Sequence, residues 1–99
     1  MSLLFFDTEF TGLHKGTTLI SIGIVDDKGR TFYAEFADYD GGQVDEWVKQ
    51  NVIHNLLWNN YKLIDSMTTD KRGIKGTTSD VSKALQEWLS NYEKVQFIS

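Results

Sequence analysis

Alternation between apolar and polar positions divides the first half of the chain into strands. The apolar run at 3–6 predicts a buried strand over 3–7, and the nearly continuous apolar run at 19–25 predicts a second. The segment 30–36 alternates between apolar and polar side chains, which is typical of a strand with one buried face. A turn at 26–29 ends in glycine and suits a tight hairpin. We therefore expect a three-stranded antiparallel meander.

The second half predicts helices and one more strand. A short helix is expected over 43–51, and the glycine, threonine and charge of 67–78 predict a mobile surface loop. A longer helix follows, with Thr78 or Ser79 as its N-cap. Its apolar residues fall on one stripe at helical spacing: Val81, Ala84, Leu85, Trp88, Leu89 and Tyr92. The apolar run at 95–98 predicts a fourth strand.

This order of elements predicts an α/β fold with a mixed sheet. A helix between the third and fourth strands favours a parallel return of the fourth strand beside the first. The length of 99 residues and the content of 40% hydrophobic and 24% charged residues indicate a single globular domain, 1–99.

Composition limits the cellular location and the kinds of binding partner that we expect for the protein. The chain has no cysteine, no apolar run near the ~20 residues that span a bilayer and no secretory signal pattern, so we expect a cytoplasmic protein without membrane contact. The net charge of −4 disfavours a passive nucleic-acid binding module. A metal-dependent nuclease escapes that argument, because bound cations bridge an acidic site to phosphate.

Candidate chemistry lies at the end of the first predicted strand. Asp7 and Glu9 occupy positions i and i+2, so their carboxylates point the same way from Cα atoms roughly 7 Å apart. Two like charges placed together repel each other, and a divalent cation is the commonest reason to keep them. Oxygen ligands suit Mg²⁺ or Mn²⁺, and two such ions can clamp an in-line phosphoryl displacement. Asp7 is the natural bridging ligand, while Glu9 can reach a second ion or orient the attacking water.

The residues after the acidic pair are candidates for substrate binding. Phe10, Thr11, Gly12 and Leu13 supply a backbone turn and an apolar edge, where a terminal nucleotide could stack. An isolated acidic i, i+2 pair is usually only solvated, but the longer string that follows an apolar strand is more specific.

In this string the chain resembles the DEDD superfamily of 3′–5′ exonucleases, which share a ribonuclease H-like fold. The string from Asp7 to Leu13 is similar to the first exonuclease motif, and 19–25 is similar to the strand that follows it. Further similarity, at 29–34 and 47–49, points to a group of short bacterial and phage exoribonucleases. The resemblance implies that Asp7 and Glu9 bind two Mg²⁺ or Mn²⁺ ions and that 10–13 contact an RNA 3′ end.

The resemblance covers only part of the family's pattern. The family also uses a second aspartate after a further strand, and a third motif with a histidine or tyrosine before a last aspartate. The segment 95–99 is similar to the lead-in to the second motif, and neither remaining motif is present. We therefore expect 1–99 to be a truncated domain that is nearly inactive alone and that self-associates as a homo-oligomer.

Other candidate residues have structural interpretations that are favoured over functional ones. His14 is expected in a solvated loop, and His54 and Trp58 at the core. The tight basic cluster is expected in the mobile loop: Lys71, Arg72 and Lys75.

Three functions remain in order of preference. A metal-dependent 3′–5′ exonuclease acting on RNA comes first. A non-catalytic or split ribonuclease H-like module that acts through a partner or an oligomer comes second. Endonuclease or integrase chemistry comes third, because in those enzymes the first strand normally contributes one aspartate, and Glu9 does not fit.

Overall fold

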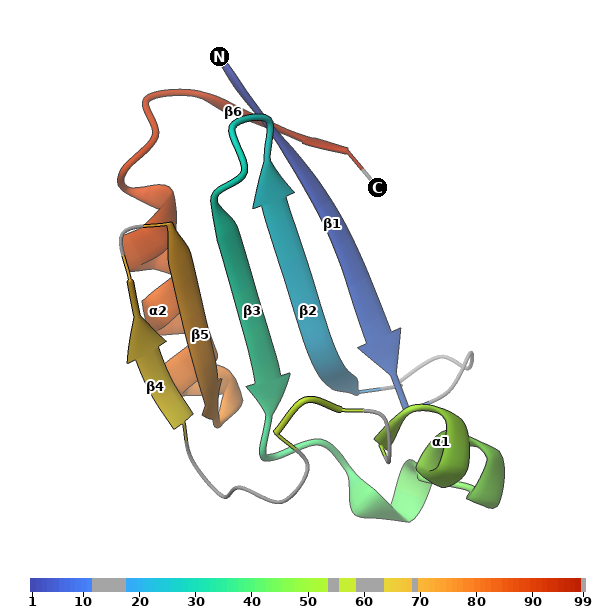
Figure 1. Cartoon of the computed structure of the whole chain (residues 1–99). Coiled ribbons are helices and arrows are strands. Elements are labelled where there is room, and N and C mark those ends of the chain that lie inside the picture. The colour runs from blue at the N-terminus through green and yellow to red at the C-terminus, as the bar shows by residue number, and fades with distance from the viewer. Residues whose placement is uncertain (12–17, 54–55, 59–63, 69, 99) are drawn as a thin grey trace.

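The computed structural model describes residues 1–11, 18–53, 56–58, 64–68 and 70–98. They form one six-stranded mixed sheet with two α-helices and a short 3₁₀ helix (Figure 1). The elements run in the order β1 Ser2–Phe10, β2 Leu19–Asp26, β3 Thr31–Phe36, η1 Gly41–Gln43, α1 Glu46–Asn51, β4 Ile64–Met67, β5 Lys71–Gly76, α2 Thr78–Leu89 and β6 Val95–Ile98.

The predicted meander is confirmed. Strand β2 pairs antiparallel with both β1 and β3, and the turn between β2 and β3 holds Gly29 at a positive φ of 91°. Strand β6 pairs parallel with β1, as the position of a helix before it predicted. The order across the sheet is β4-β5-β3-β2-β1-β6.

The prediction of a mobile loop at 67–78, and with it the count of four strands, is wrong. This region contributes β4 and β5, and β5 pairs parallel with β3. Its charged residues are used inside the sheet: the buried Arg72 guanidinium donates to Asp65 at 2.6 Å. Ile74 of β5 enters the core. The basic cluster is therefore not a solvated loop, although Lys71 itself is exposed.

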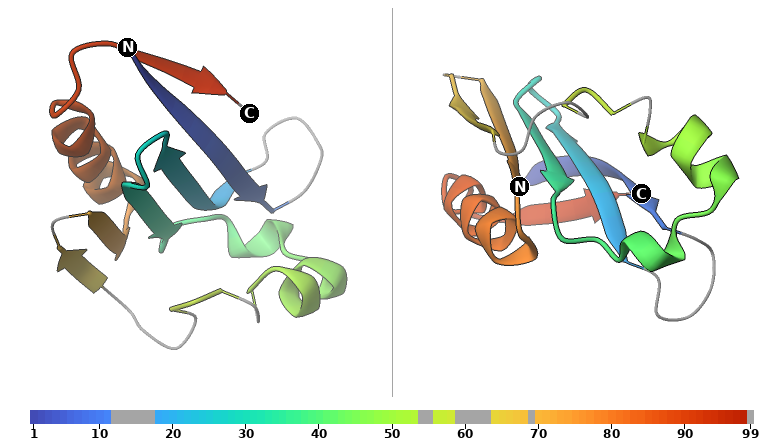
Figure 2. Two further views of the ribbon diagram at one scale, coloured as in Figure 1. Left: turned by 45° about the horizontal axis from the view of Figure 1, so that its top comes forward. Right: turned by 90° about the horizontal axis from the view of Figure 1, so that it is seen from below.

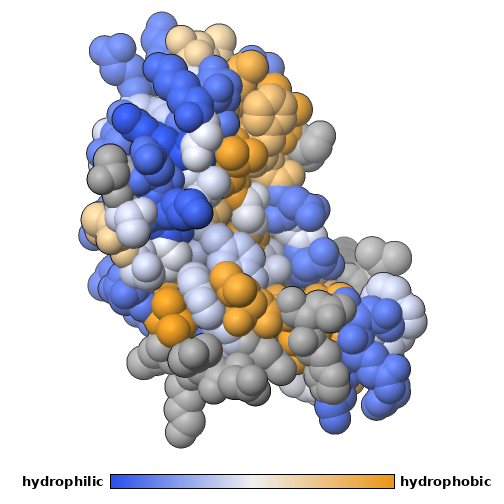
Figure 3. Space-filling model, in the orientation of Figure 1, coloured by the Kyte–Doolittle hydropathy of each residue, from blue (hydrophilic) through white to orange (hydrophobic). Residues whose placement is uncertain are grey.

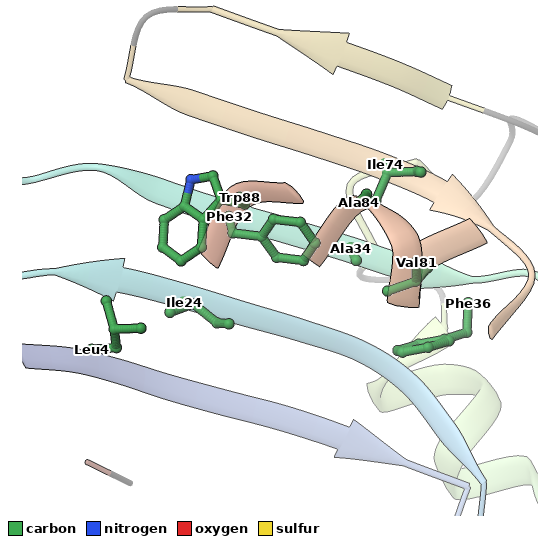
Figure 4. Close-up of a cluster of buried hydrophobic side chains, with 9 residues drawn as sticks. All are labelled: Leu4, Ile24, Phe32, Ala34, Phe36, Ile74, Val81, Ala84 and Trp88. Carbon is green, nitrogen blue, oxygen red and sulfur yellow. The ribbon is translucent and has the colours of Figure 1, made fainter. Parts of the chain in front are cut away.

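One face of the sheet is covered by α2 (Figure 2). Three buried residues of this helix pack on Phe32 and its neighbours in β1, β2, β3 and β5: Val81, Ala84 and Trp88 (Figure 4). The ring centroids of Phe32 and Trp88 lie 5.7 Å apart. The predicted stripe is confirmed. The helix begins one residue earlier than expected, because Thr77 and Asp80 form a reciprocal capping box.

The predicted helix over 43–51 divides into η1 and α1. Asp45 caps α1 by accepting from the Val48 amide, and Val48 and Val52 pack with Ile20 in a second, smaller cluster. Both short helices lie at the end of the sheet toward which β1, β3 and β5 run (Figure 1). Among the described residues, no helix is long and apolar enough to cross a bilayer.

The face opposite α2 is partly covered by Trp58, which reverses one expectation for β3. Glu35, on the polar side of the predicted alternation, is fully buried. Its Oε2 accepts from the Tyr33 hydroxyl at 2.7 Å and from the Trp58 amide at 2.9 Å. Lys75 donates to the Trp58 carbonyl at 2.7 Å. A Cβ on Gly73 would lie 2.6 Å from the Trp58 ring, so the close approach requires glycine.

Candidate metal and nucleic-acid site

Asp7 and Glu9 lie inside β1 rather than at its end. The strand continues to Phe10, three residues beyond the predicted boundary, because Asp7 pairs with Gly23 and Glu9 pairs with Ser21 of β2. A bulge between Glu9 and Phe10 then breaks the register. The acidic pair is thus held by a regular ladder, and the irregularity begins directly after it.

The two carboxylates leave the same face of the sheet, as their spacing predicted. Both residues are in the ladder and two positions apart. Leu4 packs in the core under α2 and is an odd number of positions from Asp7, so the acidic pair faces away from α2. Strand β6 pairs with β1 only as far as Phe5, so in the described part of the chain the outer edge of β1 is unpaired beside the acidic pair.

Both carboxylates are free to accept ligands. Asp7 and Glu9 are exposed, and among the described residues neither side chain has a hydrogen-bond or ion-pair partner. Within the same residues, no group of three or more His, Cys, Asp or Glu side chains is placed to hold a metal. Two free carboxylates on one face fit a hard cation such as Mg²⁺, which retains several waters when proteins supply only one or two ligands.

A shallow apolar depression adjoins Asp7 on this face. It has a volume of about 430 Å³, and its lining includes Phe5, Gly23, Val25 and Tyr33. Figure 3, which looks onto the face opposite α2, shows an apolar area over the β1–β2 part of the sheet. Phe5 and Val25 are 42% and 39% exposed. The acidic pair therefore borders a surface that can accept an apolar group.

Of the predicted substrate-binding residues, the structure describes Phe10 and Thr11. Phe10 is 38% exposed and accessible beside Glu9. Thr11 is 1% exposed, and its hydroxyl donates to Gln43 Oε1 at 2.6 Å, so its side chain is used within the fold. Gly12, Leu13 and His14 lie outside the described residues, and so does His54.

Sequence reasoning did not identify Gln43 or Glu35 as neighbours of this region. Gln43 accepts hydrogen bonds from the hydroxyls of Thr11 and Thr18, and nothing in the local sequence signals that long-range contact. Glu35 lies in the same cross-strand row as Glu9, with Ser21 between them. Glu35 is fully buried and its Oε2 is already engaged by Tyr33 and Trp58, so it is not accessible as a ligand.

The sequence is similar over most of its length to proteins of known class. Two curated proteins of Mycobacterium tuberculosis, from strains CDC 1551 and H37Rv, are each 32% identical to it over 97 residues. Both are named 3′–5′ exoribonuclease. The similarity covers 92% of this chain and 56% of each relative, so the chain spans about half the length of the curated relatives it matches. The sequence matches no protein-family model.

Proposed function

We propose that this chain carries the first acidic motif of a metal-dependent 3′–5′ exoribonuclease with a ribonuclease H-like fold of the DEDD type. The observation that carries the proposal is the pair of exposed carboxylates of Asp7 and Glu9 on one face of β1, neither of which has a partner among the described residues. The similarity to two exoribonucleases supports the reaction class. The reaction proposed is hydrolysis of the terminal phosphodiester of RNA, with release of a 5′-mononucleotide.

In this proposal Asp7 and Glu9 hold Mg²⁺ or Mn²⁺. When bound, two such ions neutralise phosphate charge and stabilise the attacking and leaving oxygens of an in-line displacement. Asp7 would hold an ion, and Glu9 would hold a second ion or orient water. Phe10 and the residues that follow it, through Leu13, are proposed to contact the terminal nucleotide. The exposed ring of Phe10 supports a stacking role there.

We expect the 99-residue chain alone to bind Mg²⁺ weakly and to have little activity. Two carboxylates leave most positions of an octahedral ion to water, and Mg²⁺ gives up its waters reluctantly. Calorimetric titration with Mg²⁺ measures this directly. Tight binding would contradict this expectation.

The first experiment locates the metal without depending on activity. Paramagnetic Mn²⁺ is titrated into isotope-labelled protein, and the broadening of backbone amide signals is followed by NMR. We expect broadening centred on 7–9, lost in Asp7→Asn and in Glu9→Gln. Asp27→Asn removes the same charge from an exposed turn residue in the hairpin between β2 and β3 and is the matched control. Broadening centred elsewhere, or unchanged in Asp7→Asn, would contradict the metal site.

The second experiment tests the reaction. A 5′-labelled RNA oligonucleotide and its DNA counterpart are incubated with Mg²⁺ or Mn²⁺ and either the chain or a version extended at its C-terminus. Stepwise shortening of RNA from the 3′ end, abolished in Asp7→Asn and retained in Asp27→Asn, is the expected result. An inactive extended protein, or one whose rate survives Asp7→Asn, would sink the proposed activity.

Exposed apolar residues support a second candidate, a split or non-catalytic module that acts through a partner or an oligomer. Phe5 on one face and Phe97 on the other are 42% and 49% exposed at the β1–β6 end of the sheet. Such exposure at a sheet edge is typical of an interaction surface. Light scattering at increasing concentration tests the oligomer, and a persistent monomer counts against it.

A further inference from the structure

A group of hydroxyls and one amide oxygen closes the end of β1 just after the acidic pair. Thr11 and Thr18 face each other: the Thr11 amide donates to the Thr18 carbonyl at 2.9 Å, and the Thr18 amide donates to Thr11 Oγ1 at 3.0 Å. These bonds bring the last residue described after β1 next to the residue that precedes β2. The pairing of the two strands is thereby extended past the bulge that follows Glu9.

One side chain from a distant element holds both threonines. Gln43 Oε1 accepts from the Thr11 hydroxyl at 2.6 Å and from the Thr18 hydroxyl at 3.0 Å. The amide of Asp40, the residue that caps η1, donates to Thr18 Oγ1 at 3.0 Å. Thr11 is 1% exposed, so its bonds are shielded from water. We call Thr11, Thr18, Asp40 and Gln43 the threonine cluster.

The cluster lies next to the bulge that interrupts the regular pairing of β1 with β2. Up to Glu9 the position of β1 is fixed by regular pairing with β2, and on its other side the described chain provides no neighbour beyond Phe5. After the bulge, Phe10 pairs with Leu19, and the bonds of Thr11 follow directly. Glu9 and Phe10 therefore flank the bulge, between the regular ladder that runs up to Glu9 and the bonds of Thr11 to Thr18 and Gln43.

We propose that Gln43 is a positioning residue that fixes Glu9 and Phe10 relative to Asp7, and so sets the affinity of the acidic pair for a divalent cation. This inference rests on the proposed metal site. Gln43 does not touch the metal or the RNA; it acts through Thr11. Metal affinity commonly falls 10- to 100-fold when a group that orients the ligands is removed.

The test uses paired variants in the 99-residue chain, read out by Mn²⁺ broadening of amide signals and by hydrogen exchange of the Thr11 amide. Gln43→Met removes the acceptor while keeping the side chain's length. Thr18→Val replaces the Thr18 hydroxyl, which donates to Gln43 and accepts from the Asp40 amide, by a methyl group of similar shape. Thr18→Ser restores the hydroxyl. Thr68→Val is the control, since in the described part of the chain Thr68 bonds only within the turn between β4 and β5.

We expect Gln43→Met and Thr18→Val to weaken Mn²⁺ binding by about tenfold and to speed Thr11 amide exchange while the core amides of α2 stay protected. Thr18→Ser and Thr68→Val should bind Mn²⁺ with an affinity within about twofold of the wild type, because neither removes a hydrogen bond of the threonine cluster. If Gln43→Met does not fold, the Thr18→Val and Thr18→Ser pair decides the question.

The outcomes separate the two proposals. Faster Thr11 exchange with unchanged Mn²⁺ affinity, or no change in either, overturns the positioning role and leaves the metal site standing. Absence of Mn²⁺ broadening at 7–9 in the wild type overturns the metal site, and the positioning role falls with it.

Discussion

Glu9 and Glu35 stand in one cross-strand row on one face of the sheet, yet their environments are opposite. Glu9 is exposed and, among the described residues, has no partner, whereas Glu35 is 0% exposed and accepts two hydrogen bonds. Lys75 Nζ lies 3.9 Å from the second oxygen of Glu35. The same residue type on the same face thus serves the fold in one case and remains available in the other.

The difference follows from what covers each strand. Trp58 seals the β3–β5 side, so Glu35 exchanges its water for the Tyr33 hydroxyl and the Trp58 amide. No described element covers β1 beside Asp7 and Glu9. A carboxylate that is fully buried, with one oxygen held by two buried donors, is poorly placed to ligate a cation, while an exposed carboxylate can exchange its water for metal. The free pair, not the buried residue, is therefore the candidate site.

The largest effect is expected when the buried carboxylate is removed. Glu35→Ala strips the Trp58 amide and Tyr33 hydroxyl of their acceptor and leaves Lys75 without its buried countercharge. Breaking such a buried pair costs about 3–5 kcal/mol. Glu9→Ala, the same change two strands away, should alter the free energy of unfolding by less than about 0.5 kcal/mol. Urea denaturation of both variants measures the contrast, and similar losses would show that the two environments do not differ.

A smaller effect distinguishes two glycines in the neighbouring row, which runs Asp7, Gly23, Tyr33, Gly73. At Gly73 a Cβ would lie 2.6 Å from the Trp58 ring, and overpacking of this kind costs about 1–3 kcal/mol. At Gly23 a Cβ would lie 4.0 Å from the Tyr33 ring, an ordinary contact. Gly73→Ala should therefore lower the thermal midpoint and quench or shift Trp58 fluorescence, and Gly23→Ala should do neither. Equal midpoints would mean that Trp58 does not pack on β5 as described.

These contrasts explain which parts of the fold could be predicted from the sequence. The meander, the stripe of α2 and the parallel return of β6 follow from local periodicity and from the handedness of strand connections, so they were predictable. The segment 67–78 was misassigned because its glycines and charges are typical of loops. Gly73 instead makes room for Trp58, and Arg72 is buried because Asp65 pairs with it. Those reasons depend on residues brought together only by the fold.

The candidate metal site, like the fold, could be predicted from the sequence only where local periodicity determines it. Strand parity alone places Asp7 and Glu9 on one face, and the ladder confirms it. The continuation of β1 to Phe10 and the contact of Thr11 with Gln43, 32 residues away, depend on tertiary pairing. The roles of Asp7 and Glu9 in metal binding stay predictions for the Mn²⁺ titration.

Asp26, a third carboxylate, is intermediate between the two extremes and provides a pH test. It is 5% exposed on the α2 side, and it accepts from the Tyr92 hydroxyl at 2.8 Å and from the amides of Lys28 and Arg30. Burial alone would raise the pKa of Asp26, but the hydrogen bonds from Tyr92, Arg30 and Lys28 outweigh it and hold the pKa below 3.8. Burial, together with the bond to Asp26, raises the pKa of Tyr92 from 10.0 to about 12.

The two shifts act in opposite pH directions on one hydrogen bond. A depressed carboxyl pKa stabilises the fold above 3.8 and is lost as the pH falls through the lowered value. A raised phenol pKa stabilises the fold below 10.0 and is lost as the pH rises toward 12. Tyr92→Phe should therefore cost about 1 kcal/mol near neutral pH, where the bond is intact, and progressively less toward either limit. Urea denaturation across this range gives the profile of the free energy of unfolding against pH.

The control is Tyr39→Phe, at a half-buried tyrosine whose hydroxyl has no hydrogen bond in the described structure. Its difference in unfolding free energy from the wild type should not change with pH. A flat profile for Tyr92→Phe as well would mean that the Tyr92 hydroxyl does not bond Asp26 as the structure shows.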